Sequence, residues 1–375
     1  MMETTLTEPF ILAAAVSLTI AVAFCTSLFA SQSRRFLDQP NERSSHSLAT
    51  PRTGGLAIIG GWLTGLFILG AFSSDLDFAR KAGWLALFAG LALGLGLADD
   101  KFNLSPSWKF AGQVLIAAGF AAVFGPFELF PAPVVGDLRL PVFWGVMITV
   151  IWVVGFMNVF NFMDGANGLA SGAAVVGLVW IAVIAAGAGA GIIFAPAFLL
   201  AVAVLGFLPL NIRRGKIFMG DNGSQSVGFL ISAIAVAGVN LSDGRMSALI
   251  APVIFMPFIF DVSWTLVSRF IRKQNIFEAH REHLYQLLMR NGASHVEVAV
   301  IYMTLIGLCA AAALLMLALP YSLQWLVPSA LAASFILGAS VVYSRAYRDG
   351  LLSTVRAQKP LDEPQIKQKP LRAAE

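Results

Sequence analysis

Long apolar stretches separated by short polar segments make up most of this chain. Each runs for roughly 16 to 24 residues, the length that crosses the hydrocarbon core of a bilayer as a helix. About eleven stretches are predicted to span a membrane: 9–30, 54–72, 83–98, 108–124, 140–159, 167–187, 190–209, 223–241, 247–266, 296–319 and 324–344. Strict alternation of apolar and polar residues is absent, so the pattern predicts an all-α, polytopic membrane protein.

Composition agrees with that architecture. Of the 375 residues 58% are hydrophobic and only 12% are charged, whereas a soluble domain has about 25% charged residues. The first span lacks a basic segment before it and a cleavage site of small residues, which predicts a retained helix. Residues 1–346 are expected to form the membrane domain. Residues 347–375 are polar and contain several prolines, which predicts a disordered tail.

The basic residues indicate the orientation. With the N-terminus outside, four of the 25 Lys and Arg residues fall on the outer side, namely Arg80, Lys81, Arg139 and Arg245. This positive-inside pattern predicts a periplasmic N-terminus and a cytoplasmic C-terminus. Because the net charge of +4 comes from inner loops and the tail, it favours contact with anionic lipid headgroups. No nucleic-acid partner is expected.

Polar residues gather in five segments, and the predicted topology places all of them in the cytoplasm. The segments are 31–53, 99–108, 158–168, 210–223 and 267–295. Carboxylates and histidines near membrane depth are costly and usually mark a site or an ion path. Together they predict a water-facing active site at the cytoplasmic end of a helical bundle.

Two of these segments carry carboxylates suited to a divalent cation. Asp99 and Asp100 end the third span, and the pair could coordinate Mg²⁺ or act as a base. The alternative is that they only mark the membrane boundary. Lys109 could meet a phosphate or extend to the headgroups. Asp221 precedes another span, where a helix start and the basic residues in 213–216 favour anionic phosphates. A capped polar turn is the alternative for Asp221.

The segment after the fifth span repeats polar residues at every third position. Asn158, Asn161 and Asp164 would therefore line one stripe at a helix end. Gly165 permits a turn and a close approach of the backbone to a ligand. A capped helix break is the alternative, and it accounts for Asp164 but not for two asparagines in an apolar stretch.

The longest internal cytoplasmic segment carries two histidines. The spacing of His280 and His283 predicts that both lie on one helix face. They lack a third zinc ligand nearby and the order His-Glu-x-x-His, so zinc binding would be weak. Binding of a phosphate or a sugar hydroxyl beside Arg281 fits the sequence equally well. Surface histidines without a role are the remaining alternative. Cys25 and Cys309 are isolated in apolar spans, which predicts packing roles.

Carboxylates for Mg²⁺, basic residues for phosphates and access from lipid together indicate phosphoryl transfer. A transporter or lipid flippase is the main alternative. Such proteins place polar residues near the membrane midplane and often contain internal repeats, whereas this chain gathers them at one end of its spans. An intramembrane metalloprotease is a third hypothesis, which zinc content would test.

The five polar segments, taken in order, resemble the polyprenyl-phosphate N-acetylhexosamine-1-phosphate transferases. This bacterial membrane family includes the enzyme that makes lipid I and the initiators of O-antigen synthesis. The resemblance covers residues 38–286, and the last segment is similar to that of the O-antigen subgroup. The matching segments are DQPNERSSHSLATPRTGG, LADDKFNLSPSWKFAGQ, NVFNFMDGANGLASG, NIRRGKIFMGDNGS and AHREHLYQ.

The resemblance implies transfer of a sugar-1-phosphate from a UDP-N-acetylhexosamine to undecaprenyl phosphate, with release of UMP, in the bacterial inner membrane. It implies Mg²⁺, or Mn²⁺ as an alternative, bound by Asp221 and Asp100, and initiation of a polysaccharide such as O-antigen. Asp99, Asp100, Asp164 and Asp221 would be catalytic. The implied substrate-binding residues are Lys109, Asn161, Asn167, Asn211, His280, Arg281 and His283. A homodimer is compatible with the sequence, although no single patch specifies one.

Two positions depart from the family pattern. Asn103 and Asn167 stand where the family commonly has Asp. Asparagine keeps a similar shape and a carbonyl acceptor but loses the charge and adds donors. A metal role is therefore not expected for either residue, and Asn167 is a candidate for nucleobase recognition.

Overall fold

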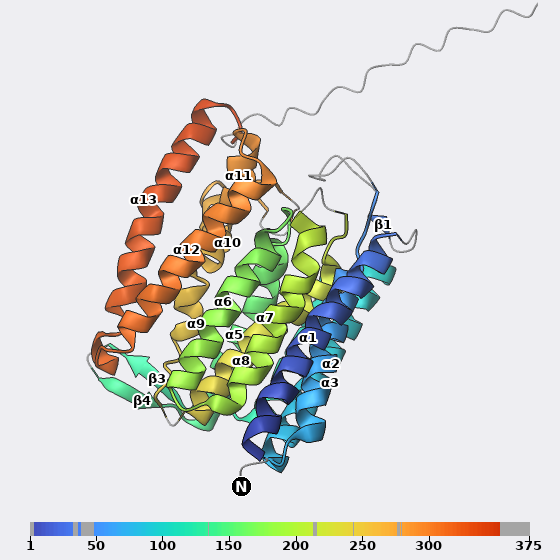
Figure 1. Cartoon of the computed structure of the whole chain (residues 1–375). Helices are drawn as coiled ribbons and strands as arrows, with labels where there is room; N and C mark the ends of the chain where they lie inside the picture. The colour runs from blue at the N-terminus through green and yellow to red at the C-terminus, as the bar shows by residue number, and fades with distance from the viewer. Residues whose placement is uncertain are drawn as a thin grey trace, which may run out of the picture.

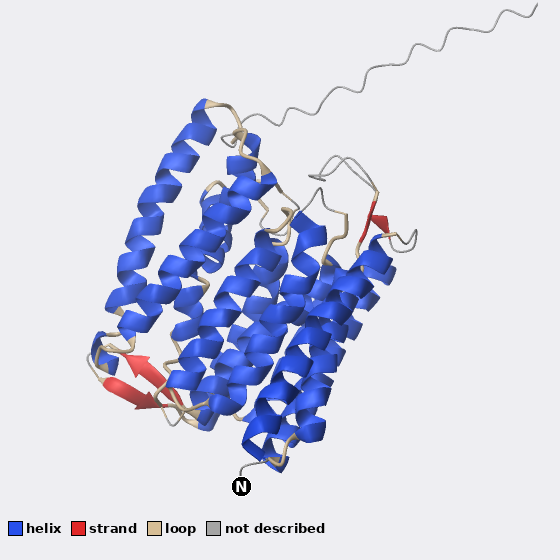
Figure 2. Ribbon diagram, viewed as in Figure 1, coloured by secondary structure: helices blue, strands red, loops and turns tan. Residues whose placement is uncertain are grey.

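The helices of the protein stand side by side in one bundle (Figures 1 and 2). The computed structural model describes residues 4–32, 37–38, 49–133, 135–212, 216–242, 244–275, 278 and 280–352. The helices are α1 (Thr4–Ser31), α2 (Gly54–Phe72), α3 (Leu76–Phe102), α4 (Pro106–Phe124), α5 (Val142–Phe162), α6 (Leu169–Gly187), α7 (Gly191–Ile212), α8 (Gly220–Leu241), α9 (Ile250–Ile254), α10 (Met256–Ile271), α11 (Leu284–Arg290), α12 (His295–Met316) and α13 (Leu326–Arg348), with a 3-10 turn at Tyr321–Leu323.

Ten described helices are individually long and apolar enough to cross a membrane. The predicted continuous span 247–266 is wrong, because the chain there forms two helices that meet at Phe255. Pro257 in the first turn of α10 lacks a backbone N–H, and at that position a helix needs none, so it favours a helix start there. Figure 1 shows α9 below α10 in the same column. Together the two helices take the place in the bundle of the single predicted span.

Two short strand pairs are added to the helices. Strands β1 (Leu37–Asp38) and β2 (Thr50–Pro51) pair antiparallel, as do β3 (Leu129–Ala132) and β4 (Gly136–Arg139). Figure 2 places the β3–β4 hairpin at the opposite end of the bundle from β1 and β2. The predicted all-α membrane architecture is confirmed, with these strands confined to its two ends.

Alternation of helix direction brings the predicted polar segments together. The ends of α3, α5 and α7 and the start of α8 lie at the same end of the bundle as α11 (Figure 1). The start of α1 lies at the other end. Most of the predicted basic first loop and the predicted tail beyond residue 352 lie outside the described residues.

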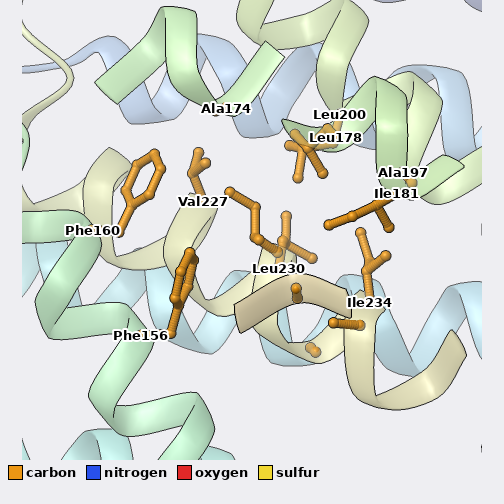
Figure 3. Packing of buried hydrophobic residues seen from close by; sticks show 14 of the residues in the cluster. Phe156, Phe160, Ala174, Leu178, Ile181, Ala197, Leu200, Val227, Leu230 and Ile234 are labelled. Carbon is orange, nitrogen blue, oxygen red and sulfur yellow. The ribbon is translucent and has the colours of Figure 1, made fainter. Parts of the chain in front are cut away.

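Helix α8 forms the centre of the bundle. Nearly all of its residues are buried, although it starts with polar positions. In Figure 3, Val227 and Leu230 of α8 lie among side chains from neighbouring helices, including Phe156 and Phe160 of α5 and Leu178 of α6. Burial on all sides fixes the position of the N-terminus of α8, where Asp221 lies.

Glycines let α2 and α3 approach that N-terminus closely. A methyl group at Gly96 of α3 would lie 2.5 Å from the carbonyl oxygen of Asp221 and would also overlap Asn222. A methyl group at Gly55 of α2 would overlap Gly223. Such small-residue contacts are how helices pack closely in membranes. The polar end of the bundle is therefore assembled by backbone-to-backbone contact.

We predict that Gly96→Ala destabilises the protein by about 1–3 kcal/mol, because the added methyl group overpacks against backbone that cannot rotate away. Gly94→Ala is the matched control, since a methyl group at Gly94 would meet no described atom within 4 Å. Thermal unfolding of the purified protein in detergent should show a lower Tm for Gly96→Ala and an unchanged or slightly higher Tm for Gly94→Ala. Equal Tm values for the two variants would contradict the close α3–α8 contact.

Candidate active site

An ammonium group lies between two carboxylates where the polar segments meet. Lys109 Nζ at the start of α4 is 2.5 Å from Asp99 Oδ2 at the end of α3 and 2.6 Å from Asp221 Oδ2 at the start of α8. The Asp221 side chain is 32% exposed, so the cluster is open to solvent. These ion pairs hold Lys109 in the carboxylate cluster, and its contact with a phosphate stays a prediction.

Asp100 points away from this cluster and binds the start of α8. Its Oδ1 accepts a hydrogen bond from the Asp221 backbone N–H (3.2 Å), and its Oδ2 accepts from the backbone N–H (3.0 Å) and side-chain amide (2.6 Å) of Asn222. The first N–H groups of a helix have no partner within the helix and carry its positive dipole end. Asp100 therefore orients Asp221, and the two adjacent aspartates have different surroundings.

Two of the three residues of the predicted stripe, Asn158 and Asn161, lie on α5, whereas Asp164 lies in the loop after it. The Asn161 side-chain amide donates to Asp221 Oδ1 (3.1 Å) and to Ser224 Oγ (2.8 Å). Asn158, one turn deeper, donates to Gln113 Oε1 at 2.8 Å. Asn161 thus belongs to the central cluster, and Asn158 supports it from below.

Asp164 lies in the loop after α5 and is partly exposed to solvent. Protein surrounds it closely, and this burial, followed by the negative charges of Asp221 and Asp100, raises the pKa of Asp164 well above its usual range, while Arg52 opposes the shift. A carboxyl group that retains its proton more strongly than usual is a candidate for acid–base chemistry.

Asn211 holds two loops together instead of lining the site. It is 4% exposed. Its Oδ1 accepts hydrogen bonds from the Gly168 backbone N–H and the Ser171 hydroxyl, both at 2.8 Å, and its amide donates to the Ile217 carbonyl at 3.1 Å. The loop after α5 is thereby fixed to the loop before α8. Direct substrate binding by Asn211 has no support in these contacts.

The two asparagines that depart from the family pattern have local partners. Asn103 ends α3 in the left-handed region at φ 50°, and its backbone N–H donates to the Asp99 carbonyl at 2.8 Å. Asparagine adopts this conformation more readily than most residues. The Asn167 backbone N–H donates to His295 Nδ1 at 3.1 Å. Nucleobase recognition by the Asn167 side chain stays a prediction.

Helix α10 carries a polar stripe into the bundle. Asp261, Thr265, Arg269 and Arg272 recur every three or four residues and are all buried. Such spacing places them on one helix face. Arg269 Nη1 is 3.3 Å from Glu282 Oε1, and Arg272 pairs with the same carboxylate. These arginines, counted in the sequence as orientation signals, hold the segment 280–283 that we call the histidine loop.

Asp261 is the central acceptor for the histidine loop and is fully buried. It accepts hydrogen bonds from the backbone N–H groups of Leu284 (2.8 Å) and Tyr285 (3.1 Å) and from the Tyr302 hydroxyl (2.5 Å). His283 Nδ1 lies 3.2 Å from the same carboxylate. Sequence reasoning missed this residue, although a carboxylate inside a predicted span is itself a signal of function.

The predicted shared helix face of His280 and His283 is wrong, because both residues precede α11. Their rings still lie close, with centroids 5.0 Å apart. Burial and the positive charge of neighbouring groups, Arg269 among them, lower the pKa of His280 to about 4, so its ring is neutral at neutral pH. His280 and Arg281 are partly exposed, whereas His283 is 5% exposed. Donor binding by this loop stays a prediction.

The acidic cluster suits Mg²⁺ through few protein ligands. Among the described residues, no group of three or more His, Cys, Asp or Glu side chains could hold a metal ion. Mg²⁺ is commonly bound by one or two carboxylates together with substrate phosphates and water. Asp99 and Asp221 lie close enough for one ammonium group to pair with both, so their negative charges are concentrated at one point. The donor set therefore fits a metal that arrives with a phosphate substrate.

Comparison with known proteins agrees with this geometry. Residues 83–239 match the model of glycosyl transferase family 4. That segment runs from α3 to α8 and includes Asp99, Asp100, Lys109, Asn161 and Asp221.

Three relatives cover most of the chain. The chain is 35% identical over 269 residues to the probable undecaprenyl-phosphate N-acetylglucosaminyl 1-phosphate transferase of Bacillus subtilis, covering 71% of this chain and 74% of the relative. It is 31% identical to the decaprenyl-phosphate N-acetylglucosaminephosphotransferase of Mycobacterium leprae (79% and 82% covered). It is 32% identical to the undecaprenyl-phosphate alpha-N-acetylglucosaminyl 1-phosphate transferase of Thermotoga maritima (70% and 76% covered). The chain therefore belongs to glycosyl transferase family 4, among the polyprenyl-phosphate N-acetylhexosamine-1-phosphate transferases.

Proposed function

We propose that this protein transfers an N-acetylhexosamine-1-phosphate from a UDP-sugar to undecaprenyl phosphate, releasing UMP and forming undecaprenyl-diphosphate-sugar. The observation that carries the proposal is the cluster of Lys109 between Asp99 and Asp221 at one end of a membrane bundle. The relatives described above, which act on polyprenyl phosphates by name, support it.

Phosphoryl transfer depends on stabilising negative charge more than on a covalent bond between enzyme and substrate. An oxygen of the acceptor phosphate bonds to the β-phosphorus of the donor, and the bond from that phosphorus to the oxygen of UMP breaks. Charge on the phosphoryl oxygens is stabilised by positioned cations and hydrogen-bond donors. Lys109 would supply positive charge, while Asn161 and Asp100 hold Asp221 in place through side-chain and helix-end contacts.

Mg²⁺, with Mn²⁺ as the alternative, is the cofactor that we expect. When bound it would neutralise the phosphates of both substrates. Asp221 is best placed to hold it, because its side chain is partly exposed and lies opposite Asp99. Asp100 would coordinate the metal only through oxygens that already accept hydrogen bonds from the start of α8.

The proposal also covers the membrane face at which the enzyme acts and the step of polysaccharide synthesis that it catalyses. The end of the bundle that carries the site also carries most of the basic residues in the predicted topology, which favours the cytoplasmic face of a bacterial inner membrane. There the enzyme would use a cytoplasmic UDP-sugar and a lipid acceptor, and the product would initiate a polysaccharide such as O-antigen.

The direct test is UMP release by purified protein with undecaprenyl phosphate, Mg²⁺ and a panel of UDP-N-acetylhexosamines. We expect UMP to appear when lipid acceptor, donor and metal are all present, and the active donor identifies the sugar. Omission of each component in turn and addition of a chelator are the controls. Folded protein that releases no UMP with any member of the panel would contradict the proposal.

Asp221→Asn should lower the rate of UMP release by about two to three orders of magnitude, because it removes charge where phosphoryl transfer needs a metal ligand. Asp137→Asn, an exposed position on β4 at the other end of the bundle, is the matched control and should leave the rate unchanged. Thermal unfolding checks that both variants are folded. Turnover by Asp221→Asn close to that of the parent protein would refute the site assignment.

Asp164→Asn should lose activity yet stabilise the metal-free protein at neutral pH. The pKa of Asp164 in the folded protein lies above its ordinary value of 3.8, so folding opposes ionisation and the parent loses stability as pH rises above about 4. The neutral amide avoids this loss. Tm measured with chelator should favour Asp164→Asn at pH 8 and converge with the parent near pH 4. A constant difference across that range would show that ionisation of Asp164 is not the cause.

A further inference from the structure

Tyr285 connects the histidine loop to the end of α5. It is the second residue of α11 and is 1% exposed. Its hydroxyl donates to the carbonyl oxygen of Phe162, the last residue of α5, at 3.2 Å, and accepts from Gln286 Nε2 at the same distance. Carbonyls in the last turn of a helix have no partner within the helix. Tyr285 therefore supplies the hydrogen bond that α5 lacks at this point.

The loop that carries Asp164 is shaped around the Tyr285 ring. A methyl group at Gly165 would overlap the Tyr285 hydroxyl and lie 3.0 Å from the ring carbon that bears it. The His283 ring stacks with the Phe162 ring, at a centroid distance of 6.1 Å, and with the Tyr285 ring, at 5.8 Å. The backbone next to Asp164 thus rests on side chains from the histidine loop and α11.

Tyr285 is itself held in place by α10. Its backbone N–H and that of Leu284 donate to Asp261, and the Tyr302 hydroxyl of α12 donates to the same carboxylate. Burial, followed by the charges of Asp261 and Asp164, raises the pKa of Tyr285, so its hydroxyl stays protonated and remains a donor. The connection to Phe162 therefore starts from a fixed point in the bundle.

We propose that Tyr285 is a positioning residue of the transfer reaction, which keeps the loop bearing Asp164 in register with the histidine loop. The inference rests on the proposed function and on the roles that the family resemblance implies, in which the histidine loop holds the donor and Asp164 is a catalytic carboxylate. The Tyr285 hydroxyl touches neither substrate in this scheme. It acts by fixing the distance between Asp164, which lies in the loop after α5, and the histidine loop, which precedes α11.

The test compares two hydroxyl deletions on the same loop. Tyr285→Phe removes the hydrogen bond to Phe162. Tyr343→Phe is the matched control, because the Tyr343 hydroxyl of α13 donates to the carbonyl of Glu282 at 3.3 Å and ties the histidine loop to α13 instead of α5. The readouts are kcat and donor KM for UMP release, together with Tm in detergent.

We expect Tyr285→Phe to lower kcat by about tenfold or more, since a misplacement near 1 Å can cost about a hundredfold in rate. The KM for the UDP-sugar should change by less than about threefold, because the donor contacts are kept. Tyr343→Phe should keep kcat within about twofold of the parent. Its Tm should fall by about as much as that of Tyr285→Phe. A normal kcat for Tyr285→Phe, or equal losses in both variants, overturns the inference.

A second measurement tests the contact with Gly165. Gly165→Ala should slow UMP release, because the new methyl group displaces the Tyr285 hydroxyl and with it the loop of Asp164. If the two residues act through one contact, the double variant Gly165→Ala/Tyr285→Phe should be no slower than Gly165→Ala alone. Losses that multiply would show independent effects and overturn the inference. A parent protein that releases no UMP would instead overturn the proposed function itself.

Discussion

The carboxylate of Asp100 bound to the N-terminus of α8 is the interaction on which the site depends. Helix α8 is buried from Asn222 to Val239, so most N–H groups at its start must find partners within the protein. Asp100 provides them, and Gly96 lets α3 approach closely enough for the contact. Because Asp221 is the first acidic residue of α8, this one contact sets where its side chain meets Lys109 and Asn161.

The described residues of the site carry more negative than positive charge. Asp99 and Asp221 pair with Lys109, and Asp100 and Asp164 lie near Asp221, with Arg52 opposing the pKa shift of Asp164. Like charges held close together in a partly buried site are unfavourable until a cation arrives or a proton is retained. A divalent metal would relieve this repulsion and at the same time present positive charge to the substrates.

The histidine loop is held in place by a different set of interactions. Its residues are held by side chains of α10, namely the Asp261 carboxylate and the two arginines that pair with Glu282. A carboxylate with several donors and no solvent is a strong anchor, because breaking it would leave buried polar groups unpaired. The loop can therefore present His280 and Arg281 at the surface while His283 stays buried beneath them.

The sequence alone determined the membrane architecture, the grouping of polar segments at one end and most of the candidate site, because apolar length, basic-residue bias and carboxylate position are local properties. It could not separate Asp99, which binds Lys109, from Asp100, which binds α8, since adjacent residues differ only by the direction in which the helix turns them. Nor did the sequence indicate that Asn211 joins the loops around α6 and α7 or that His283 contacts Asp261, and substrate binding by these two residues stays a prediction. The role of Asp261 also depended on contacts between elements distant in the chain, because Tyr302 of α12 donates to it. Tertiary structure decided which polar groups gather around Lys109 and which hold the others in place, because that choice rests on partners that no local pattern contains.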